Sequence, residues 1–594
     1  MRRLRAILLA GALLAVAGGL LSAQTRFDLA EVRWTVAPAP GGDEVHLELQ
    51  LAPLHDRERV VLRLPLWRPG SYNYANFQNR LSGLKARDQE GRERRIRKLD
   101  PRTWEVESGG ASALTVAYEL DVENEAGPDA PPAVHLNGPA TFLYLEDALK
   151  LPHSLRFELP GGWQAASGHR PVPGKPGLFR SPDYDVFADC PIALGGLERH
   201  AFESHGTPFE VVFFGRPPSE EDLPRKEWVG KVQAIVGAAH DLVGAFPFEK
   251  YVFLFLFNNT PGGYGLEHLN STSIGWNFRG IQNGRTRGLE SVTAHEFFHL
   301  WNVKRIRPRQ LGPFDYSQDV RTHDLWWLEG VTSYYGDVIQ VRAGLRKEPG
   351  WFWDAQARVL AKAARSPGWG LVSPERASWT VWDPDPRRRI SYYDQGQILG
   401  FLLDLKIRAA TQNRRSLDDV VRFLFRWVDY PDPGYRPGDL ERAIRAVTGW
   451  DDRAFFERYV RGVLPFPVEE VLPEAGLLVR SSRPTLGIRL DEKLAVTLEK
   501  DSPAAKGGLQ NGDLLKRIGD ARVRDRDGVR KLVDSLAPGS TVTLQVERAG
   551  KRLKIELPVG ERKLVPAEIR PDPDAALWRK EIPGGILAGI PEPI

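Results

Sequence analysis

Cysteine and methionine are almost absent from this 594-residue sequence, which contains one of each. Because Cys190 is the only cysteine, no intrachain disulfide can form, and the fold must rest on its hydrophobic cores. Net charge is also small: +4 overall, or +1 if Arg2, Arg3 and Arg5 belong to a removed leader (78 basic against 77 acidic residues). This balance gives no reason to expect nucleic acid or an acidic membrane surface as a partner.

Long apolar runs are missing from the sequence after its first residues. The basic start of the chain is followed by an apolar run from Ala6 to Leu21 and then by Ser22-Ala23, which is typical of a cleaved signal peptide over residues 1–23. An uncleaved membrane anchor is the alternative, disfavoured because a spanning helix wants about 20 apolar residues. Export without disulfides favours a bacterial periplasm over a eukaryotic secreted protein.

The length of the chain exceeds what one hydrophobic core supports, so we predict several domains. Apolar residues alternate with polar ones in EVHLELQL (44–51), which predicts antiparallel strands. Apolar residues at helical spacing follow from Trp228 to Val243, and the chain reads as mostly helical to about Val463. The predicted architecture is a β-sandwich-like domain (24–197), a mostly helical α+β catalytic domain (198–463), a linker (464–482), a compact β-rich module (483–561) and a C-terminal tail (562–594).

The stretch TAHEFFHLW (293–301) places two histidines four residues apart. On a helix this spacing puts His295 and His299 on one face, where both imidazoles can bind one zinc ion. Glu296 lies one position round, within reach of a metal-bound water, so we predict it as the general base. A buried helix face that merely includes two histidines is the structural alternative.

A third protein ligand is expected, because hydrolytic zinc sites combine three protein ligands with one water. Glu329 is the best candidate, since it lies in the apolar stretch DLWWLEGV and a buried carboxylate must be paired or metal-bound. A helix-terminal salt bridge is its alternative role. Asp319, Asp337 and His323 are weaker candidates for the third ligand.

These residues carry a resemblance to a known family. H-E-x-x-H followed by W-x-x-E-G resembles the gluzincin pattern, and HEFFHLWNVKRIRP with GLEH, WLEG and the early LPLWRPGSY resembles the glycyl aminopeptidase family, metallopeptidase family sixty-one. The resemblance implies a β-rich N-terminal domain, a thermolysin-like catalytic domain and a PDZ domain. The 29 residues between His299 and Glu329 exceed the wider gluzincin spacing and predict an inserted loop at about 304–319.

The resemblance also implies substrate-binding residues. In GGYGLEH (262–268), Gly263 and Gly265 allow close backbone approach to a ligand, Glu267 would hold the free α-ammonium, and His268 completes the segment. The alternative is a β-turn whose glutamate faces water.

In SYYDQGQ (391–397), Tyr393 would donate to the oxyanion, with Tyr392 as its rival if the register differs by one and a core tyrosine as the structural alternative. Gln395 stands where related enzymes carry lysine, which leaves the role of that lysine unfilled.

The C-terminal module resembles a PDZ domain. Leu486, Gly487 and Ile488 would form the loop whose backbone N–H groups bind a peptide C-terminus, and Gly508–Asp513 matches a second marker of the family. Thr485 replaces a larger apolar residue at the first loop position. A module that serves only for docking or dimerisation is the alternative.

The sequence therefore predicts an exported aminopeptidase with one Zn²⁺ per chain, acting on peptides with a free N-terminus and preferring Gly or Ala there. Two alternatives remain: a zinc endopeptidase without amine selection, and a PDZ-based peptide-binding scaffold with a vestigial peptidase domain.

Overall fold

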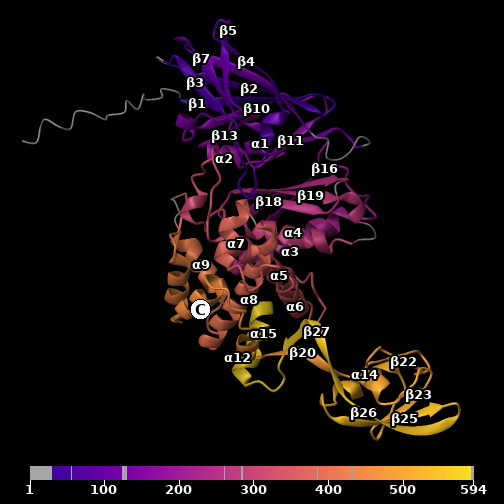
Figure 1. The fold of residues 1–594 in the computed structure, drawn as a ribbon. Coiled ribbons are helices and arrows are strands. Elements are labelled where there is room, and N and C mark those ends of the chain that lie inside the picture. The colour runs from indigo at the N-terminus through magenta and orange to yellow at the C-terminus, as the bar shows by residue number, and fades with distance from the viewer. Residues whose placement is uncertain are drawn as a thin grey trace, which may run out of the picture. The chain divides into compact units, whose positions relative to one another are not determined.

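The structure, a computed structural model, describes residues 30–589 except 55–56, 123–129, 260, 282–284, 349, 384, 429 and 432–433. The predicted signal peptide lies outside the described residues. The chain forms two compact units (Figure 1). The first ends at Leu197 but does not include Pro69–Tyr74, which packs with the second unit, 198–594. Among the described helices none is both long and apolar enough to cross a membrane.

The N-terminal unit consists mainly of antiparallel strands. Strand β2 (Glu44–Ala52) buries Val45, Leu47, Leu49 and Leu51 completely, which confirms the alternating pattern. Its eight-stranded sheet has the order β12-β13-β10-β1-β2-β8-β4-β5, in which only the β1–β10 pair is parallel among the described strands. The remaining strands of this sheet are β1 (Glu31–Pro38), β4 (Leu81–Asp88), β5 (Glu93–Arg94), β8 (Leu114–Asp121), β10 (His153–Phe157), β12 (Arg170–Pro171) and β13 (Leu178–Ser181).

Two smaller sheets and two short helices complete this unit. The sheets have the orders β3-β7-β6 and β11-β14-β9. Their strands are β3 (Arg59–Arg63), β6 (Ile96–Asp100), β7 (Thr103–Glu107), β9 (Ala133–Leu136), β11 (Gln164–Ser167) and β14 (Ile192–Gly195), and the helices are α1 (Gly138–Thr141) and α2 (Tyr184–Ala188).

A five-stranded sheet supports the catalytic half of the second unit. Its order is β15 (Glu198–Ser204), β16 (Thr207–Gly215), β17 (Tyr251–Asn258), β19 (Ser271–Asn277) and β18 (Gly263–Glu267). The three central strands are parallel, and the two edge strands, β15 and β18, are each antiparallel to their neighbours. The glycine-rich stretch predicted as a turn is thus a strand, because its backbone pairs with β19 along its whole length.

Helices surround the predicted zinc-binding segment. Helix α3 (Arg225–Val243) forms at the predicted spacing, and α4 (Arg287–Phe298) carries the H-E-x-x-H residues. Glu290 anchors α4 through ion pairs with Lys231 at 3.1 Å and with Arg346. Further helices are α5 (Thr332–Arg342), α6 (Trp351–Ala364), α7 (Pro374–Trp379), α8 (Tyr392–Ala410), α9 (Leu417–Trp427), α10 (Asp439–Thr448), α11 (Arg453–Phe455) and the π-helical turns η5 (Trp326–Val331) and η8 (Phe456–Val460).

The segment predicted as a linker, 464–482, is regular structure instead. It contains α12 (Val468–Glu474) and the start of β20 (Leu477–Thr485), which pairs with β27 (Gly560–Pro571). Its prolines suggested a linker, yet Pro473 lies within α12 while Leu472 is fully buried. The C-terminal tail is docked: α15 (Leu577–Ala588) receives two hydrogen bonds from Arg342 to its Ile586 carbonyl, at 3.0 and 3.1 Å.

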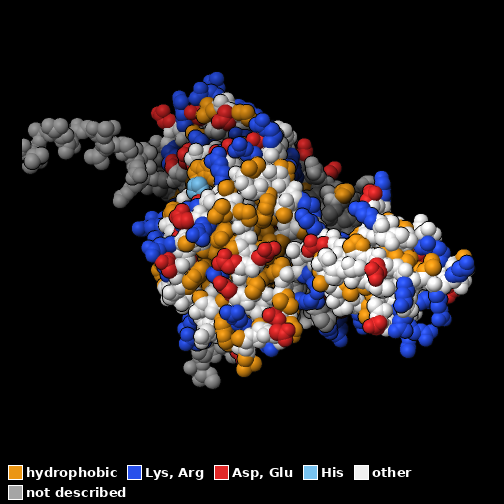
Figure 2. Space-filling view, turned by 60° about the horizontal axis from the view of Figure 1, so that its bottom comes forward, with side chains coloured by type: hydrophobic (Ala, Val, Ile, Leu, Met, Phe, Trp, Pro, Cys, Tyr) orange, Lys and Arg blue, Asp and Glu red, His pale blue; other side chains and the backbone are white. Residues whose placement is uncertain are grey.

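The predicted PDZ module is therefore inserted between two paired strands. It has its own hydrophobic core, a hairpin of β21 and β22, and a sheet of order β24-β23-β25-β26. On the face drawn in Figure 2, acidic and basic side chains are interspersed with apolar ones, in line with the small net charge. The elements of the module are β21 (Ile488–Leu490), β22 (Val496–Leu498), α13 (Pro503–Lys506), β23 (Leu514–Ile518), β24 (Ala521–Arg522), α14 (Arg526–Asp534), β25 (Thr541–Arg548) and β26 (Lys551–Pro558).

Candidate metal centre

Two imidazoles meet at the C-terminal end of α4. The Nε2 atoms of His295 and His299 are 3.0 Å apart and their ring planes cross at 85°. The helix ends at Phe298, before the end of the stretch 293–301 that carries the motif, and His299 is its C-cap. Val303 has a φ of +129°, a strained backbone for a β-branched residue. The chain turns sharply here, directly after the second histidine.

Glu329 completes a triad with the two histidines, as the sequence predicts. Its Oε2 lies 3.5 Å from His295 Nε2 and 3.2 Å from His299 Nε2. It sits on the π-helical turn η5, a geometry common at functional sites. Asn302 connects this turn to the end of α4, because its Nδ2 donates to the carbonyls of Trp327 at 2.9 Å and Leu328 at 3.3 Å.

The second nitrogen of each histidine is hydrogen-bonded. His299 Nδ1 donates to the Asn302 carbonyl at 2.9 Å, since a carbonyl can only accept. Ser333 Oγ donates to the Glu329 carbonyl at 3.0 Å and lies 3.3 Å from His295 Nδ1, from which it accepts. Such partners fix the tautomer of metal-binding histidines. The two Nε2 atoms consequently face each other and the Glu329 carboxylate, an arrangement that a shared cation would stabilise.

The dimensions of the triad match zinc. Ligand atoms about 2.0–2.1 Å from a tetrahedral Zn²⁺ lie about 3.3 Å from one another. The three separations here are 3.0, 3.2 and 3.5 Å. The donor set of two imidazoles and one carboxylate is the set found in catalytic zinc sites that keep a position open for water. The residues present therefore fit a single zinc ion.

The pKa shifts of the triad residues also favour a bound cation. Burial raises the pKa of the Glu329 carboxyl, but His299 and His295 outweigh it and hold that pKa well below its usual range. Burial lowers the pKa of His299, and the Glu329 carboxylate overrides this and raises it to about 10. Glu329 is thus a fully ionised carboxylate that gathers positive charge around it, which is the role a divalent cation would take over.

Glu296 points its carboxylate into the same site. It is 7% exposed, and burial raises its pKa well above the usual value despite the opposing charge of His299. Strand β18 lies directly against it, since a methyl group added at Gly265 would overlap the Glu296 carboxylate. Gly265 is therefore required for the close approach of β18 to Glu296, and its predicted close approach to a ligand stays a prediction. Gly263 is required for packing instead, because a side chain there would meet the ring of Trp276.

Glu267 joins the site from the end of β18. Ligand atoms of Glu267, Glu296 and His299 all lie within 4.8 Å of one another. A buried carboxylate is thus present where the predicted α-ammonium group would bind. His268 is also buried, and its backbone N–H donates to the Ser271 carbonyl at 3.1 Å. Its contact with substrate stays a prediction.

Both candidate tyrosines lie near the triad at the start of α8. The Tyr393 ring centroid is 6.1 Å from that of His295 and 4.8 Å from that of Tyr392. Burial and then the charge of Glu329 raise the pKa of both hydroxyls. The charge of Glu296 contributes to the rise for Tyr393 but not for Tyr392. This favours Tyr393 as the oxyanion donor, which stays a prediction.

Two glycines allow the turn that carries Glu329 and the helix that carries Tyr393 to pack closely. A methyl group added at Gly330 would overlap the backbone of Gly396, and one added at Gly396 would overlap the Trp326 carbonyl. The turn η5 and helix α8 can therefore approach closely only because both positions lack a side chain. The glycine after each functional residue in WLEG and YYDQG is the sequence signal for this contact.

Sequence reasoning missed the contribution of Pro69–Tyr74 to the site. Gly70, with a φ of +86°, lies so near Glu267 that a methyl group there would be 2.8 Å from both carboxylate oxygens. Tyr72 is 9% exposed, and burial followed by the charges of Glu329 and Glu267 raises the pKa of its hydroxyl. The stretch LPLWRPGSY was recognised as a family feature without any role at the metal centre.

The weaker candidates for the third ligand lie in other environments. Asp319 pairs with Arg321 at 2.8 Å, and the His323 ring stacks on Trp379 with centroids 4.5 Å apart. Asp337 accepts hydrogen bonds from two glutamine side chains, at 3.0 and 2.9 Å. The inserted loop at 304–319 is present, and the one helical turn described within it is the 3₁₀ turn Arg309–Leu311.

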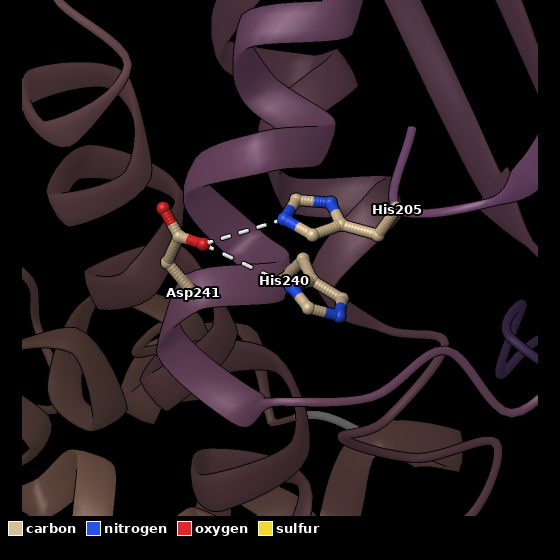
Figure 3. A group of neighbouring side chains, drawn as sticks. All are labelled: His205, His240 and Asp241. Atoms are coloured by element: carbon tan, nitrogen blue, oxygen red, sulfur yellow. Dashed lines mark ion pairs between the residues drawn. The ribbon is translucent and has the colours of Figure 1, made fainter. Parts of the chain in front are cut away.

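A second group of possible ligands, His205, His240 and Asp241, is shown in Figure 3. Asp241 lies 3.7 Å from His205 and 3.8 Å from His240, but the two rings are stacked, with centroids 3.7 Å apart and planes 20° from parallel. Imidazole lone pairs lie in the ring plane, so nearly parallel rings cannot both point at one ion, unlike the crossed rings of His295 and His299. His205 and His240 therefore form a stacked pair of rings and not two ligands of one metal ion.

The predicted carboxylate-binding loop of the PDZ module is partly engaged within the chain. The Gly487 N–H donates to the Thr485 hydroxyl at 3.0 Å, and the Leu486 carbonyl accepts from Ala504 at 2.9 Å. Ile488 begins β21. In this structure Thr485 therefore occupies one of the N–H groups predicted to bind a peptide C-terminus.

Comparison with known proteins agrees with this site. Residues 289–399 match the model of the M61 glycyl aminopeptidase family, and residues 35–196 match the M61 N-terminal domain. These two segments of the chain are thus similar to the M61 glycyl aminopeptidase family. Residues 484–559 match a PDZ domain. The family and the assembled triad together make the chain a zinc metallo-aminopeptidase.

Solved structures and curated relatives extend the comparison. An aminopeptidase N family protein from Idiomarina loihiensis is 22% identical with a TM-score of 0.72, covering 92% of this chain and 99% of that one, which establishes the fold. An M1 zinc metallopeptidase from Deinococcus radiodurans is 16% identical with a TM-score of 0.46, covering 75% and 95%. A "Probable periplasmic serine endoprotease DegP-like" from Pseudomonas fluorescens is 39% identical over 67 residues, so this chain matches 11% of its own length and 14% of that protein.

Proposed function

We propose that this protein is an exported aminopeptidase that removes N-terminal residues, preferentially Gly or Ala, from peptides. The observation that carries the proposal is the position of Glu267, whose carboxylate lies within 4.8 Å of both Glu296 and His299. A carboxylate at that distance from the hydrolytic centre rewards a charged amine and measures one residue from the N-terminus.

Each group at the centre has a defined task. His295, His299 and Glu329 would hold the zinc ion, which when bound polarises a carbonyl and acidifies a water molecule. Glu296 would accept a proton from the attacking water and pass it to the leaving amine. Burial raises the pKa of Glu296, which favours the step in which it takes up a proton. Tyr393 donates a hydrogen bond to the oxyanion.

Amine selection is tested with matched peptides that have free and acetylated N-termini. The unmodified enzyme is expected to cleave Gly-Ala-Ala faster than Leu-Ala-Ala and to leave the acetylated forms uncut. Glu267→Gln should lower kcat/KM on the free peptides about 10- to 100-fold, the value of a lost hydrogen bond to a charged group. Equal cleavage of free and acetylated peptides would instead identify an endopeptidase.

Gly70→Ala tests whether the segment from the N-terminal half shapes the amine site. The added methyl group would press on the Glu267 carboxylate, so KM for free peptides should rise about tenfold, or about 1.4 kcal/mol. Gly91→Ala is the matched control, because Gly91 has a similar φ of +79° and open space around it. An unchanged KM in Gly70→Ala would show that Glu267 does not depend on this contact.

Two finer parts of the proposal rest on other grounds. The family description supports a small N-terminal residue. Export is supported by the basic start and the apolar run Ala6–Leu21. A mature protein that begins near Gln24 by N-terminal sequencing would establish cleavage, and a retained leader would contradict it.

A further inference from the structure

A cavity lies beside the start of η5, the turn that carries Glu329. It has a volume of about 280 Å³ and is lined by Asp324, Trp326, Glu375, Tyr435, Glu441 and Phe456, among others. At about 30 Å³ per water molecule this space exceeds what one bridging water fills. Its walls come from the start of η5 and from α7, α10 and η8.

Two buried polar atoms of residues that line this cavity have no partner among the described residues. They are the Tyr435 hydroxyl and the Trp326 Nε1–H, whose residues are only 2% and 1% exposed. Buried polar groups are rarely left unsatisfied, and each costs about 1–3 kcal/mol. Their position in the wall of a cavity indicates that a polar ligand or water supplies the missing bonds.

Three carboxylates line the cavity, those of Asp324, Glu375 and Glu441, together with two arginines, Arg436 and Arg461. Arg461 binds Glu441 through two nitrogens, at 2.7 and 3.1 Å, and lies 3.7 Å from Glu375. Among the described residues no cationic side chain pairs with Asp324. Burial raises the pKa of Asp324 to about 7, and the negative charge of the nearby Glu375 contributes to the rise. Burial likewise raises the pKa of Glu375, although Arg461 opposes the rise.

The geometry excludes a metal ion among the described residues but suits an organic cation. Asp324 and Glu375 belong to no group of three converging ligand atoms. An ammonium or guanidinium group has several donors, and it can bridge acceptors that a metal ion could not reach together. The rings of Trp326 and Phe456 in the wall have centroids 6.1 Å apart, and the Arg461 guanidinium already lies 5.9 Å from the Phe456 ring centroid, so this wall accommodates a planar cation.

We propose that this cavity binds an alkylammonium or alkylguanidinium group, held by Asp324 and Glu375 and by the Tyr435 hydroxyl. The shared chemistry could reach the site on a free amine or on the basic side chain of a peptide. A cation in the cavity would neutralise Asp324, which begins the turn carrying Glu329: the Asp324 carbonyl accepts from the N–H groups of Trp327 and Leu328, both at 2.9 Å.

Calorimetric titration of the full-length, zinc-loaded protein at pH 8 tests the proposal. Butylammonium and butylguanidinium are the probes, and butanol and butyrate are their neutral and anionic counterparts. Only the two cations are expected to bind, and Asp324→Asn should weaken them roughly tenfold or more. Glu375→Gln provides a second variant, in case Asp324→Asn does not fold. A cavity that takes up water alone would show no binding of either cation, which overturns the proposal.

The centre at Glu267 could also bind an amine, so its contribution is measured separately. Glu267→Gln should leave butylammonium binding unchanged if the amine occupies the Asp324 cavity. Loss of binding in Glu267→Gln with retention in Asp324→Asn would place the amine at the active site and overturn the proposal. This comparison does not require peptidase activity, so its outcome is independent of the proposed function.

The source of the cation is resolved with peptides. A lower KM for lysine-containing peptides than for norleucine analogues, with the difference lost in Asp324→Asn, would identify a substrate side chain as the occupant. Equal KM values together with tight butylammonium binding would identify a free amine. Either result supports the cavity as a cation site.

Discussion

Glu296→Gln is expected to lower kcat by about 10²–10⁴ while the protein keeps its zinc, because the amide retains the shape of the side chain but cannot accept a proton. Shape matters at this position: Gly265 of β18 lies against the carboxylate, so a larger group would displace the strand. The measurement is kcat on a free peptide together with zinc content by elemental analysis.

Glu296→Asp gives a graded comparison for this prediction. It keeps a base that is one methylene shorter, so its kcat should fall between those of the parent enzyme and Glu296→Gln. The melting temperature should change little in either variant, since Glu296 Oε2 accepts no hydrogen bond from the described residues. Retained turnover in Glu296→Gln would assign the role of base to another residue.

Glu329→Ala is expected to reduce bound zinc from one per chain to nearly none and to abolish activity. The two histidines would then face each other 3.0 Å apart without the carboxylate that gathers positive charge around them. Zinc present at about 1,000 times its dissociation constant adds about 4 kcal/mol of stability through its binding to the folded state. A chelator should consequently lower the melting temperature of the parent protein but not that of the variant.

His240→Ala is the matched control for zinc loss. It removes a histidine from the other His/Asp group, where stacked rings lie 3.7 Å apart, and should leave one zinc per chain. If His240→Ala lost the metal while Glu329→Ala kept it, the zinc would bind near the C-terminal end of α3 and not at α4. The peptidase proposal would then fail.

The metal ligands could be predicted from the sequence because local geometry determines their relation. His295 and His299 share a helix face through their spacing alone, and Glu296 follows from its place beside them. Glu329 required one more argument, namely that a carboxylate within WWLEGV cannot be buried without a partner. Strand β2 could be predicted equally well, because the alternation of apolar and polar residues along nine positions does not depend on distant segments.

Other parts of the site depend on contacts between segments far apart in the chain. Ser333 and the Asn302 carbonyl orient the imidazoles, and nothing in the local sequence marks either as a hydrogen-bond partner. The π-helical turn under Glu329 and the early end of α4 at Phe298 are likewise tertiary effects. The segment 464–482 was misread for the same reason: its prolines predicted a linker, while pairing with β27 and burial of Leu472 impose regular structure.

The sequence by itself determined the H-E-x-x-H helix, the glutamate that completes the triad, and the order of a β-rich domain, a peptidase domain and a PDZ module. Only the tertiary structure decided that Gly70 and Tyr72 lie beside Glu267, that glycines 330 and 396 let Tyr393 approach the triad, and that the chain returns from the PDZ module to dock α15. The physical reason is range: periodicity and spacing act within one element, whereas close packing joins residues separated by tens to hundreds of positions.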